Sequence, residues 1–146
     1  MRRIAFAASL TLVLAAAACG SSPSSLCSDG LQATCQKLFD CTPSAQQDAC
    51  FKEMYGTSVS DCVTKQDQGY TVTQANCGFD ATIPGAECAK MTTANACDNG
   101  DPNNTKTVYH ADKAQECIDS VKAATCSDLN NTSYTPAGCD QVCQAS

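Results

Sequence analysis

The chain has 146 residues, of which thirteen are cysteines, and its formal net charge is −6. An acidic surface repels nucleic acid and anionic lipid headgroups, so the charge argues against a nucleic-acid partner. Leu, Ile, Val and Phe supply only fifteen of the 128 residues from Cys19 onward, too little apolar material for a core alone, so we expect a fold that depends on disulfides formed in an oxidising compartment.

Residues 1–18 have the three parts of an export signal. Arg2 and Arg3 supply the positive start, an apolar stretch covers residues 4–14, and small residues lead to a cleavage point after Ala18. The apolar run is shorter than the roughly 20 residues that a membrane-spanning helix needs, and no second run of that length follows. We therefore predict that residues 1–18 are a signal peptide, which is removed together with both arginines and leaves a charge near −8.

The residues around that cleavage point, Ala16, Ala17, Ala18, Cys19 and Gly20, resemble the lipobox of bacterial lipoproteins. The resemblance implies that Cys19 becomes the first residue, carries acyl chains and anchors the protein to a membrane. Gly20 lacks the acidic side chain that favours retention of such lipoproteins in the inner membrane of Gram-negative cells, so the resemblance favours the outer membrane. The alternative is an ordinary signal cleavage after Ala18, with Cys19 as an extra cysteine.

The number of cysteines supports a separate role for Cys19. An odd number in an exported protein requires an intermolecular partner or one cysteine with a different chemical role. If Cys19 is lipidated, twelve cysteines remain, and we expect them to form six disulfides, whose connectivity the spacing alone leaves open. These cysteines are Cys27, Cys35, Cys41, Cys50, Cys62, Cys77, Cys88, Cys97, Cys117, Cys126, Cys139 and Cys143.

A flexible tether and a helical domain are predicted after the lipidated cysteine. Residues 19–26, which are rich in Gly and Ser, form the tether, and residues 27–146 form the domain. The first helix is predicted over residues 30–41 because apolar side chains recur there at helical spacing, and Ser28 or Asp29 can cap it.

Two further helical segments and a connection complete the first half. A second helix follows Pro43 and stops at Gly56, and residues 57–65 form a further helical turn. Residues 67–85 are rich in Gln, Gly, Thr and Asn without a clear period. We interpret this stretch as a connection between two halves, which Cys77 pins to the rest of the domain.

The second half is predicted to contain three helices. The first covers residues 85–97 and is followed by a polar loop over residues 98–106. The second, over residues 111–126, has the clearest amphipathic period in the chain. Thr135 and Pro136 are a start signal for a last helix, which bears the final two cysteines.

Cysteine positions on these predicted helices limit the pairing. Cys117 and Cys126 lie on opposite sides of the helix over residues 111–126, so they should bridge to different neighbours and make this helix a central element. Cys139 and Cys143 lie on one face of the last helix, so each should reach a partner outside its own helix.

The halves, residues 27–77 and 85–143, look like a diverged duplication of a helical hairpin, since residues 35–41 correspond loosely to residues 88–97, and residues 49–62, which end at Cys62, to the stretch from Glu116 through Cys126. The predicted fold class is therefore a small, disulfide-rich, all-α domain with two repeats. The spacing of cysteines, notably over residues 113–142, resembles that in the small cysteine-rich lipoproteins that are abundant in myxobacteria. This resemblance implies a location in the cell envelope and no particular activity.

Catalytic chemistry finds little support in the sequence. His110 is the only histidine, and although Asp112 and several serines are near in sequence, no Gly-x-Ser-x-Gly motif of a serine hydrolase is present. No Cys-x-x-Cys pair occurs, which disfavours both thiol exchange and a zinc site. We therefore predict no catalytic residues and no cofactor.

Two acidic groups remain as weaker candidates for a site. Residues 98–104 gather oxygen ligands of the kind that calcium prefers, but they lack the spacing of an EF-hand, and such clusters are usually turns. Asp112, Glu116 and Asp119 alternate with lysines, which is typical of a solvated helix face. We predict no metal site, and calcium at residues 98–104 stays open.

The sequence as a whole predicts a non-enzymatic, lipid-anchored binding or structural module of the cell envelope. Its partners are the membrane, through Cys19, and an envelope or extracellular protein. One alternative is a protease-inhibitor-like module that uses residues 69–74 or 98–106 as an exposed loop. The other is a small exported hydrolase or thiol enzyme.

Overall fold

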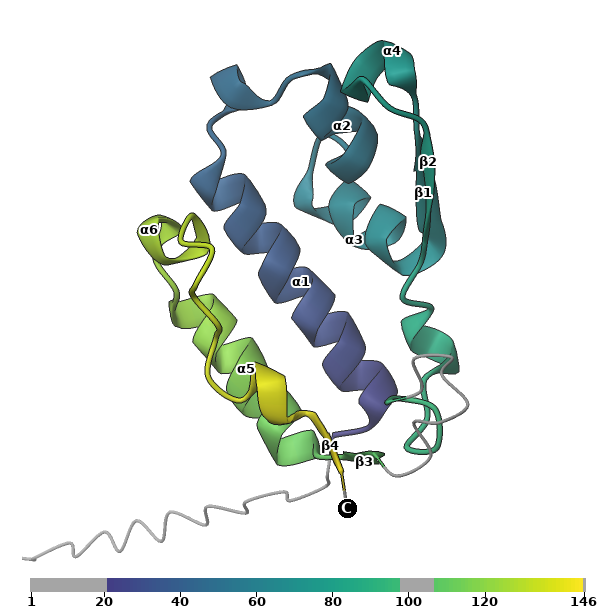
Figure 1. Ribbon diagram of the computed structural model, residues 1–146, viewed down its shortest axis with the longest axis vertical. Coiled ribbons are helices and arrows are strands. Elements are labelled where there is room, and N and C mark those ends of the chain that lie inside the picture. The colour runs from purple at the N-terminus through teal and green to yellow at the C-terminus, as the bar shows by residue number, and fades with distance from the viewer. Residues whose placement is uncertain (1–20, 98–106, 146) are drawn as a thin grey trace, which may run out of the picture.

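The computed structural model describes residues 21–97 and 107–145. Helices are the main packing elements, in line with the predicted class, and two short antiparallel ribbons are added to them. The long helix α1 (Pro23–Cys41) runs through the middle, with α5 (Ala111–Ala123) along one side and α3 (Val59–Gln68) along the other (Figure 1). Within the described ranges, no helix has both the length and the hydropathy that a membrane span needs.

Helix α1 begins earlier than the sequence analysis expected. The Ser25 N–H donates a hydrogen bond to the Ser22 hydroxyl oxygen at 3.1 Å, and Pro23 occupies the first turn. A capping serine followed by proline is a strong helix start, since the cap satisfies a free N–H and proline has no N–H to satisfy. The tether prediction is therefore wrong for residues 23–26, and Leu26 is only 3% exposed.

A short second helix follows. A single 3₁₀ turn, η1 (Ser44–Gln46), leads to α2 (Ala49–Tyr55). The predicted stop at Gly56 is confirmed, because its φ of 76° lies in the left-handed region that glycine adopts without strain. The helical turn predicted over residues 57–65 is present and extends to the end of α3.

The predicted connection over residues 67–85 is a β-hairpin. Strand β1 (Gly69–Val72) pairs with β2 (Ala81–Pro84) in antiparallel register, and the one-turn helix α4 (Gln74–Cys77) lies between them. Val72 is 1% exposed, so the hairpin contributes to the core. Strands of four residues are too short to give a clear alternating period, which is why the sequence pattern did not indicate them.

The helix predicted over residues 85–97 does not form. Only a 3₁₀ turn, η2 (Cys88–Lys90), is present there, followed by irregular turns. Glu87 has a φ of 50°, which makes it the one described non-glycine residue with positive φ. Because an α-helix cannot contain such a conformation without a steric penalty, helix formation is interrupted at this point.

The end of the chain also differs from its prediction. In place of a last helix, the 3₁₀ turn η3 (Cys139–Gln141) is followed by the strand β4 (Cys143–Ala145). Strand β4 pairs with β3 (Thr107–Tyr109) in antiparallel register. The backbone hydrogen bonds of the last residues are therefore made to a distant segment instead of within a helix.

Helix α5 confirms the clearest helical pattern in the sequence, but it ends before the predicted Cys126. Ala124 leaves the helical conformation, and Thr125 begins the one-turn helix α6 (Cys126–Leu129). Thr125 and Asp128 form a capping box, in which each side chain accepts a hydrogen bond from the other residue's N–H.

Six disulfides use all twelve cysteines from Cys27 to Cys143. Three of them connect α1 to different elements, namely η2, α6 and α3, so α1 and not α5 is the central element. The prediction that Cys117 and Cys126 have different partners is confirmed. The bridges are Cys27–Cys88, Cys35–Cys62, Cys41–Cys126, Cys50–Cys77, Cys97–Cys143 and Cys117–Cys139.

The pairing gives the predicted duplication no support. Under that alignment Cys35 corresponds to Cys88, and Cys62 corresponds to Cys126. Cys35 pairs with Cys62, whereas Cys88 and Cys126 each pair with a cysteine of α1. Two bridges thus join the halves, and the equivalent cysteines do not make equivalent bonds.

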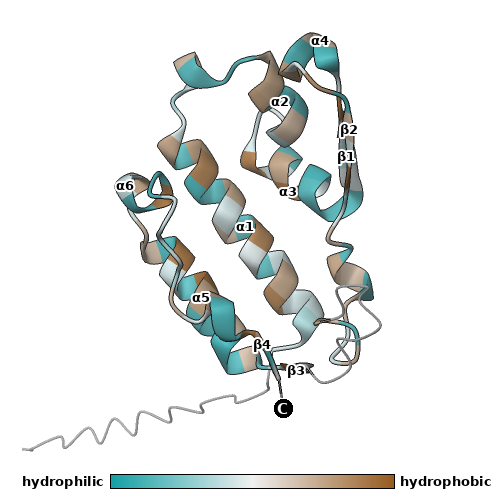
Figure 2. Ribbon diagram, viewed as in Figure 1, coloured by the Kyte–Doolittle hydropathy of each residue, from teal (hydrophilic) through white to brown (hydrophobic). Residues whose placement is uncertain are grey.

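The core is small and lies along α1. Hydrophobic and hydrophilic segments alternate along α1 and α5, so only part of each helix faces the interior (Figure 2). The apolar cluster between the two helices consists of Leu26, Ala33, Ala114 and Ile118. Several of the other buried residues are half-cystines, which means that disulfides occupy positions that aliphatic side chains would fill in a larger domain.

Candidate functional site

An open apolar pocket of about 280 Å³ lies at the end of the molecule where α1 begins. Its walls come from the first turns of α1, from α5, from the segment before Cys97 and from the region of the β3–β4 ribbon, which Figure 1 shows together at one end. None of the residues that line it has a charged side chain. They include Leu26, Gly30, Leu31, Met91, Tyr109 and Val142.

A glycine on α1 helps to leave this space open. Gly30 faces α5, and a Cβ atom at this position would have Ile118 Cγ1 as its nearest neighbour, at 3.7 Å. A larger residue would extend into the space between the helices. The pocket therefore exists in part because the sequence has no side chain at residue 30.

The opposite wall is held by the backbone of the last residues. The His110 N–H donates a hydrogen bond to the Val142 carbonyl oxygen at 2.9 Å, which fixes the ribbon beside the first turn of α5. Tyr109 is half-buried there, and burial raises the pKa of its phenol. Its ring contributes an aromatic surface to the pocket wall.

Met91 forms a more adaptable part of the pocket wall. It follows η2, is half-buried and lies outside regular secondary structure. An unbranched thioether side chain can adopt several shapes at low cost, so it fits occupants of irregular form. The pocket can thus receive an apolar chain without a fixed pattern of polar contacts.

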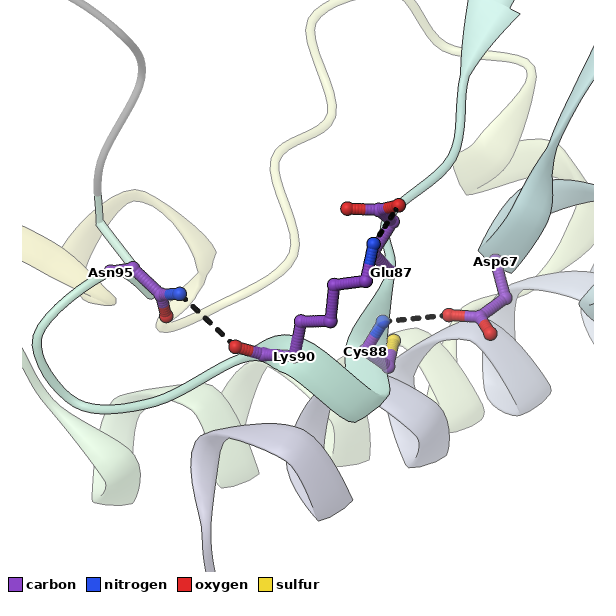
Figure 3. Close-up of polar contacts among 5 residues, drawn as sticks. All are labelled: Asp67, Glu87, Cys88, Lys90 and Asn95. Atoms are coloured by element: carbon purple, nitrogen blue, oxygen red, sulfur yellow. Dashed lines mark hydrogen bonds and ion pairs between the residues drawn. The ribbon is translucent and has the colours of Figure 1, made fainter.

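A second, polar concavity of about 250 Å³ lies between the end of α3 and η2. Figure 3 shows that Asp67 faces this turn: its Oδ1 accepts a hydrogen bond from the Cys88 N–H at 2.7 Å. The Asp67 carbonyl oxygen accepts another from the Glu87 N–H at 2.9 Å.

The same turn is closed by contacts along its own chain. Lys90 forms an ion pair with Glu87 at 2.6 Å, and the Asn95 side-chain amide donates to the Lys90 carbonyl oxygen at 3.1 Å (Figure 3). These contacts hold Cys88 where it can bridge to Cys27. The unusual conformation of Glu87 thus has a structural role.

A third concavity, of about 300 Å³, lies between α1 and α5 near the end of α1. The Lys37 ammonium group donates to the Ala124 carbonyl oxygen at 2.9 Å, and the Gln36 amide donates to Asp40 Oδ1 at 2.8 Å. The Lys37 bond connects α1 to the C-terminal end of α5, whereas the bond between Gln36 and Asp40 lies within α1.

The residues considered for catalysis do not form a constellation. His110 precedes α5, whereas Asp112 and Asp119 are exposed on that helix. Glu116 forms an ion pair with Lys113 at 2.8 Å, and this hydrogen bond raises the pKa of the Lys113 ammonium group. The acidic residues therefore lie on a solvated helix face, as the alternation with lysines predicted.

The segment proposed as an inhibitor loop, residues 69–74, is not a loop. It forms β1 and the start of α4, and its backbone groups pair with β2. An inhibitor loop must offer an extended, unpaired backbone to the protease, and this segment does not. The other proposed loop, residues 98–106, lies outside the described residues together with the candidate calcium ligands.

No family model, no curated protein and no solved structure matches the chain. Cys19 and the predicted signal peptide lie outside the described residues. Among the residues that the structure describes, no group of three or more His, Cys, Asp or Glu side chains is placed to hold a metal ion.

The apolar pocket is the feature that sequence reasoning did not find. Its residues come from four separate segments of the chain, so no local motif marks it. No local signal marked Gly30 either, because the predicted helix began at this residue. Only the start of α1 at Pro23 places Gly30 inside a helix, where a glycine often has a packing or functional reason.

Proposed function

We propose that this chain is an exported lipoprotein, held to a membrane by acyl chains on Cys19, whose domain is a non-enzymatic binding or structural module of the cell envelope. One observation carries the proposal: the six disulfides use every cysteine from Cys27 to Cys143. The thirteenth cysteine, Cys19, lies outside the described residues and has the position of the lipobox cysteine in the sequence. The lipobox position implies that the Cys19 thiol is the attachment point of a lipid.

The density of disulfides supports export. Such bridges persist in oxidising compartments and are rare where glutathione keeps thiols reduced. An outer-membrane location follows from Gly20, through the resemblance to lipoproteins of Gram-negative cells. Within that compartment the domain has no need of a large apolar core.

The position of α1 defines how close the domain is to its anchor. Only residues 20–22 separate Cys19 from the first residue of α1. Four extended steps of the chain span at most about 14 Å. The end of the domain that contains β3 and β4 therefore faces the membrane, and the end with α4 faces away (Figure 1). We assign contact with an envelope or extracellular protein to the end that faces away.

Membrane fractionation and intact mass test the anchor. We expect the wild-type protein to pellet with membranes and to have the mass of residues 19–146 plus acyl chains. A Cys19→Ala variant should move to the soluble fraction, because the anchor is lost while all six disulfides can still form. A Ser21→Ala variant is the matched control and should stay with the membrane. Unchanged partition of Cys19→Ala would contradict the proposal.

Proximity labelling from the tethered domain on whole cells tests the binding role. We expect a small, reproducible set of neighbouring envelope proteins that is lost when Cys19→Ala releases the domain. Recovery of no reproducible neighbour would contradict a binding function. A structural role in the envelope would then have to be tested by deletion of the gene.

A further inference from the structure

The apolar pocket opens at the end of α1 at which the chain arrives from Cys19. Pro23, the first residue of α1, is part of the pocket wall, together with Leu26 and Gly30 from the next two turns. An apolar surface that is left open to water is unfavourable, so an occupant of the same chemistry is expected. The site and the anchor are therefore neighbours along the chain.

The distance between them is short on the scale of the domain. Cys19 can lie at most about 14 Å from Pro23, because only three residues intervene. By comparison, the nineteen residues of α1 extend for about 28 Å. An acyl chain on Cys19 therefore starts beside the pocket, whereas the end of the domain with α4 is a full helix length away.

We propose that the pocket holds part of an acyl chain carried by Cys19, an inference that rests on the lipidation proposed above. The walls match this ligand, since aliphatic and thioether side chains line the pocket and no charged group does. The pocket is too open to enclose a whole chain, so the remaining methylenes stay in the bilayer. The contact holds the base of the domain on the membrane.

This contact opposes the electrostatic repulsion between the acidic domain and anionic lipid headgroups. Seven lysines against fifteen acidic residues from Cys19 onward give a domain that anionic headgroups repel. A free tether would let the domain move away from such a surface. An acyl chain seated between α1 and α5 counteracts the repulsion at short range.

Methionine methyl groups provide a direct test. The mature chain contains two methionines, Met91 in the pocket wall and Met54 in α2. Both are half-buried, so Met54 is a natural internal control. We would label both methyl groups with carbon-13 and place the lipidated protein in nanodiscs whose lipids have deuterated acyl chains, so that the chains on Cys19 are the protonated ones.

We expect nuclear Overhauser effects between the Met91 methyl group and acyl methylene protons, and none from Met54. These Overhauser effects at the Met91 methyl group should be absent from the Cys19→Ala protein in the same deuterated nanodiscs. If the Cys19→Ala protein shows them in nanodiscs of protonated lipid, and wild type does not show them in deuterated nanodiscs, a bilayer lipid fills the pocket and the proposal is overturned. Equal effects at Met54 and Met91 would also overturn it.

A substitution at residue 30 tests the location. Gly30 has ordinary helical backbone, and a Cβ there makes an unstrained contact, so Gly30→Leu places a side chain in the pocket. The Overhauser effects between acyl protons and the Met91 methyl group should disappear in Gly30→Leu and persist in Gly30→Ala. Gly30→Ala is the matched control, because alanine is also a strong helix former but has a smaller side chain than leucine. If these Overhauser effects persist in a folded, lipidated Gly30→Leu protein, the proposed location of the acyl chain is overturned.

The outcomes separate this inference from the function on which it rests. Intact mass reports lipidation independently of the pocket, so an unmodified Cys19 contradicts the proposed function. A lipidated wild-type protein without Met91 effects overturns the pocket alone. This comparison needs only wild type and Cys19→Ala, so it stands even if Gly30→Leu does not fold.

Discussion

The two sides of α1 are stabilised in different ways. On the α5 side, an apolar cluster built on Leu26, Ala33, Ala114 and Ile118 fills the interface. On the α3 side, the corresponding space is occupied by the Cys35–Cys62 disulfide, whose two residues are each 1% exposed. A half-cystine is a small hydrophobe, so a bridge both fills space and restricts the unfolded chain.

This difference teaches how a chain with few aliphatic residues makes a helical domain. The α5 side depends on packing, and the α3 side depends on a covalent bond at the centre of the interface. Oxidation is therefore a condition for one interface more than for the other. The following predictions test that contrast, beginning with the largest effect.

The largest loss is expected from the double variant Cys35→Ala/Cys62→Ala. It removes both the link between α1 and α3 and the buried sulfur atoms, which should lower the free energy of unfolding by about 4 kcal/mol. Urea unfolding followed by circular dichroism measures this loss. The control is Cys97→Ala/Cys143→Ala, which opens a bridge with an exposed half-cystine near the end of the chain. A larger loss in that control would contradict the contrast.

The α5 side should respond to loss of apolar volume. Ile118 is 4% exposed, so Ile118→Ala should lower the free energy of unfolding by about 3 kcal/mol through lost transfer energy and a cavity. Leu129, an aliphatic residue that is exposed on α6, is the matched control, and Leu129→Ala should cost less than about 0.5 kcal/mol. Thermal unfolding of the oxidised proteins measures both. Equal losses would show that the cluster carries little of the stability.

Helix caps give an intermediate effect on each side. The Ser58 hydroxyl oxygen accepts a hydrogen bond from the Asp61 N–H at the start of α3, and Thr125 does the same for Asp128 at α6. Ser58→Ala and Thr125→Ala should each lower the free energy of unfolding by about 1 kcal/mol. Ser60→Ala, at an exposed position of α3, is the control and should be near neutral. A loss in Ser60→Ala as large as in Ser58→Ala would refute the role of the cap.

The smallest effect is a dependence on pH. Hydrogen bonds from Thr57 lower the pKa of Asp61, and hydrogen bonds from Thr125 lower the pKa of Asp128. Because both pKa values are lower in the folded protein than in the unfolded chain, their contribution is complete above the pKa of an ordinary aspartate. It is lost as the pH falls through the folded values. This loss of stability is measured as the fall in melting temperature between about pH 6 and about pH 2, an interval that brackets the ordinary pKa of aspartate.

The matched variants for this test are Asp61→Asn and Asp128→Asn. Each should reduce the fall in melting temperature on acidification, because one titrating group is removed. Both carboxylates are exposed, so each effect should be small and weaker at high salt. An unchanged acid slope in both variants would contradict this assignment.

Much of the helical structure could be predicted because it depends on local signals. The period of apolar residues defined α5, and Gly56 defined the end of α2, since a left-handed residue stops a helix wherever it occurs. Short elements could not be predicted in this way. The hairpin strands and η2 have three or four residues each, and their form depends on contacts with distant segments.

The candidate pocket shows the same limit. Leu26 and Leu31 were visible as apolar residues, but Met91 and Val142 reach the same space from distant segments. The position of Glu87 in the left-handed region, which turns the chain after β2, is supported by hydrogen bonds to Asp67. No pattern in the sequence indicates such a pair of contacts.

The sequence by itself determined that the domain depends on oxidation, because it has too few aliphatic residues and an even dozen cysteines after Cys19. It also predicted most of α1 and α5, since helical periodicity is a local property, although α1 begins earlier and α5 ends earlier than the pattern indicated. Only the tertiary structure decided which cysteines bond, that α1 is the centre, and where an apolar pocket remains. The physical reason is that disulfide pairing and cavities depend on distances between elements, which the order of residues along the chain does not specify.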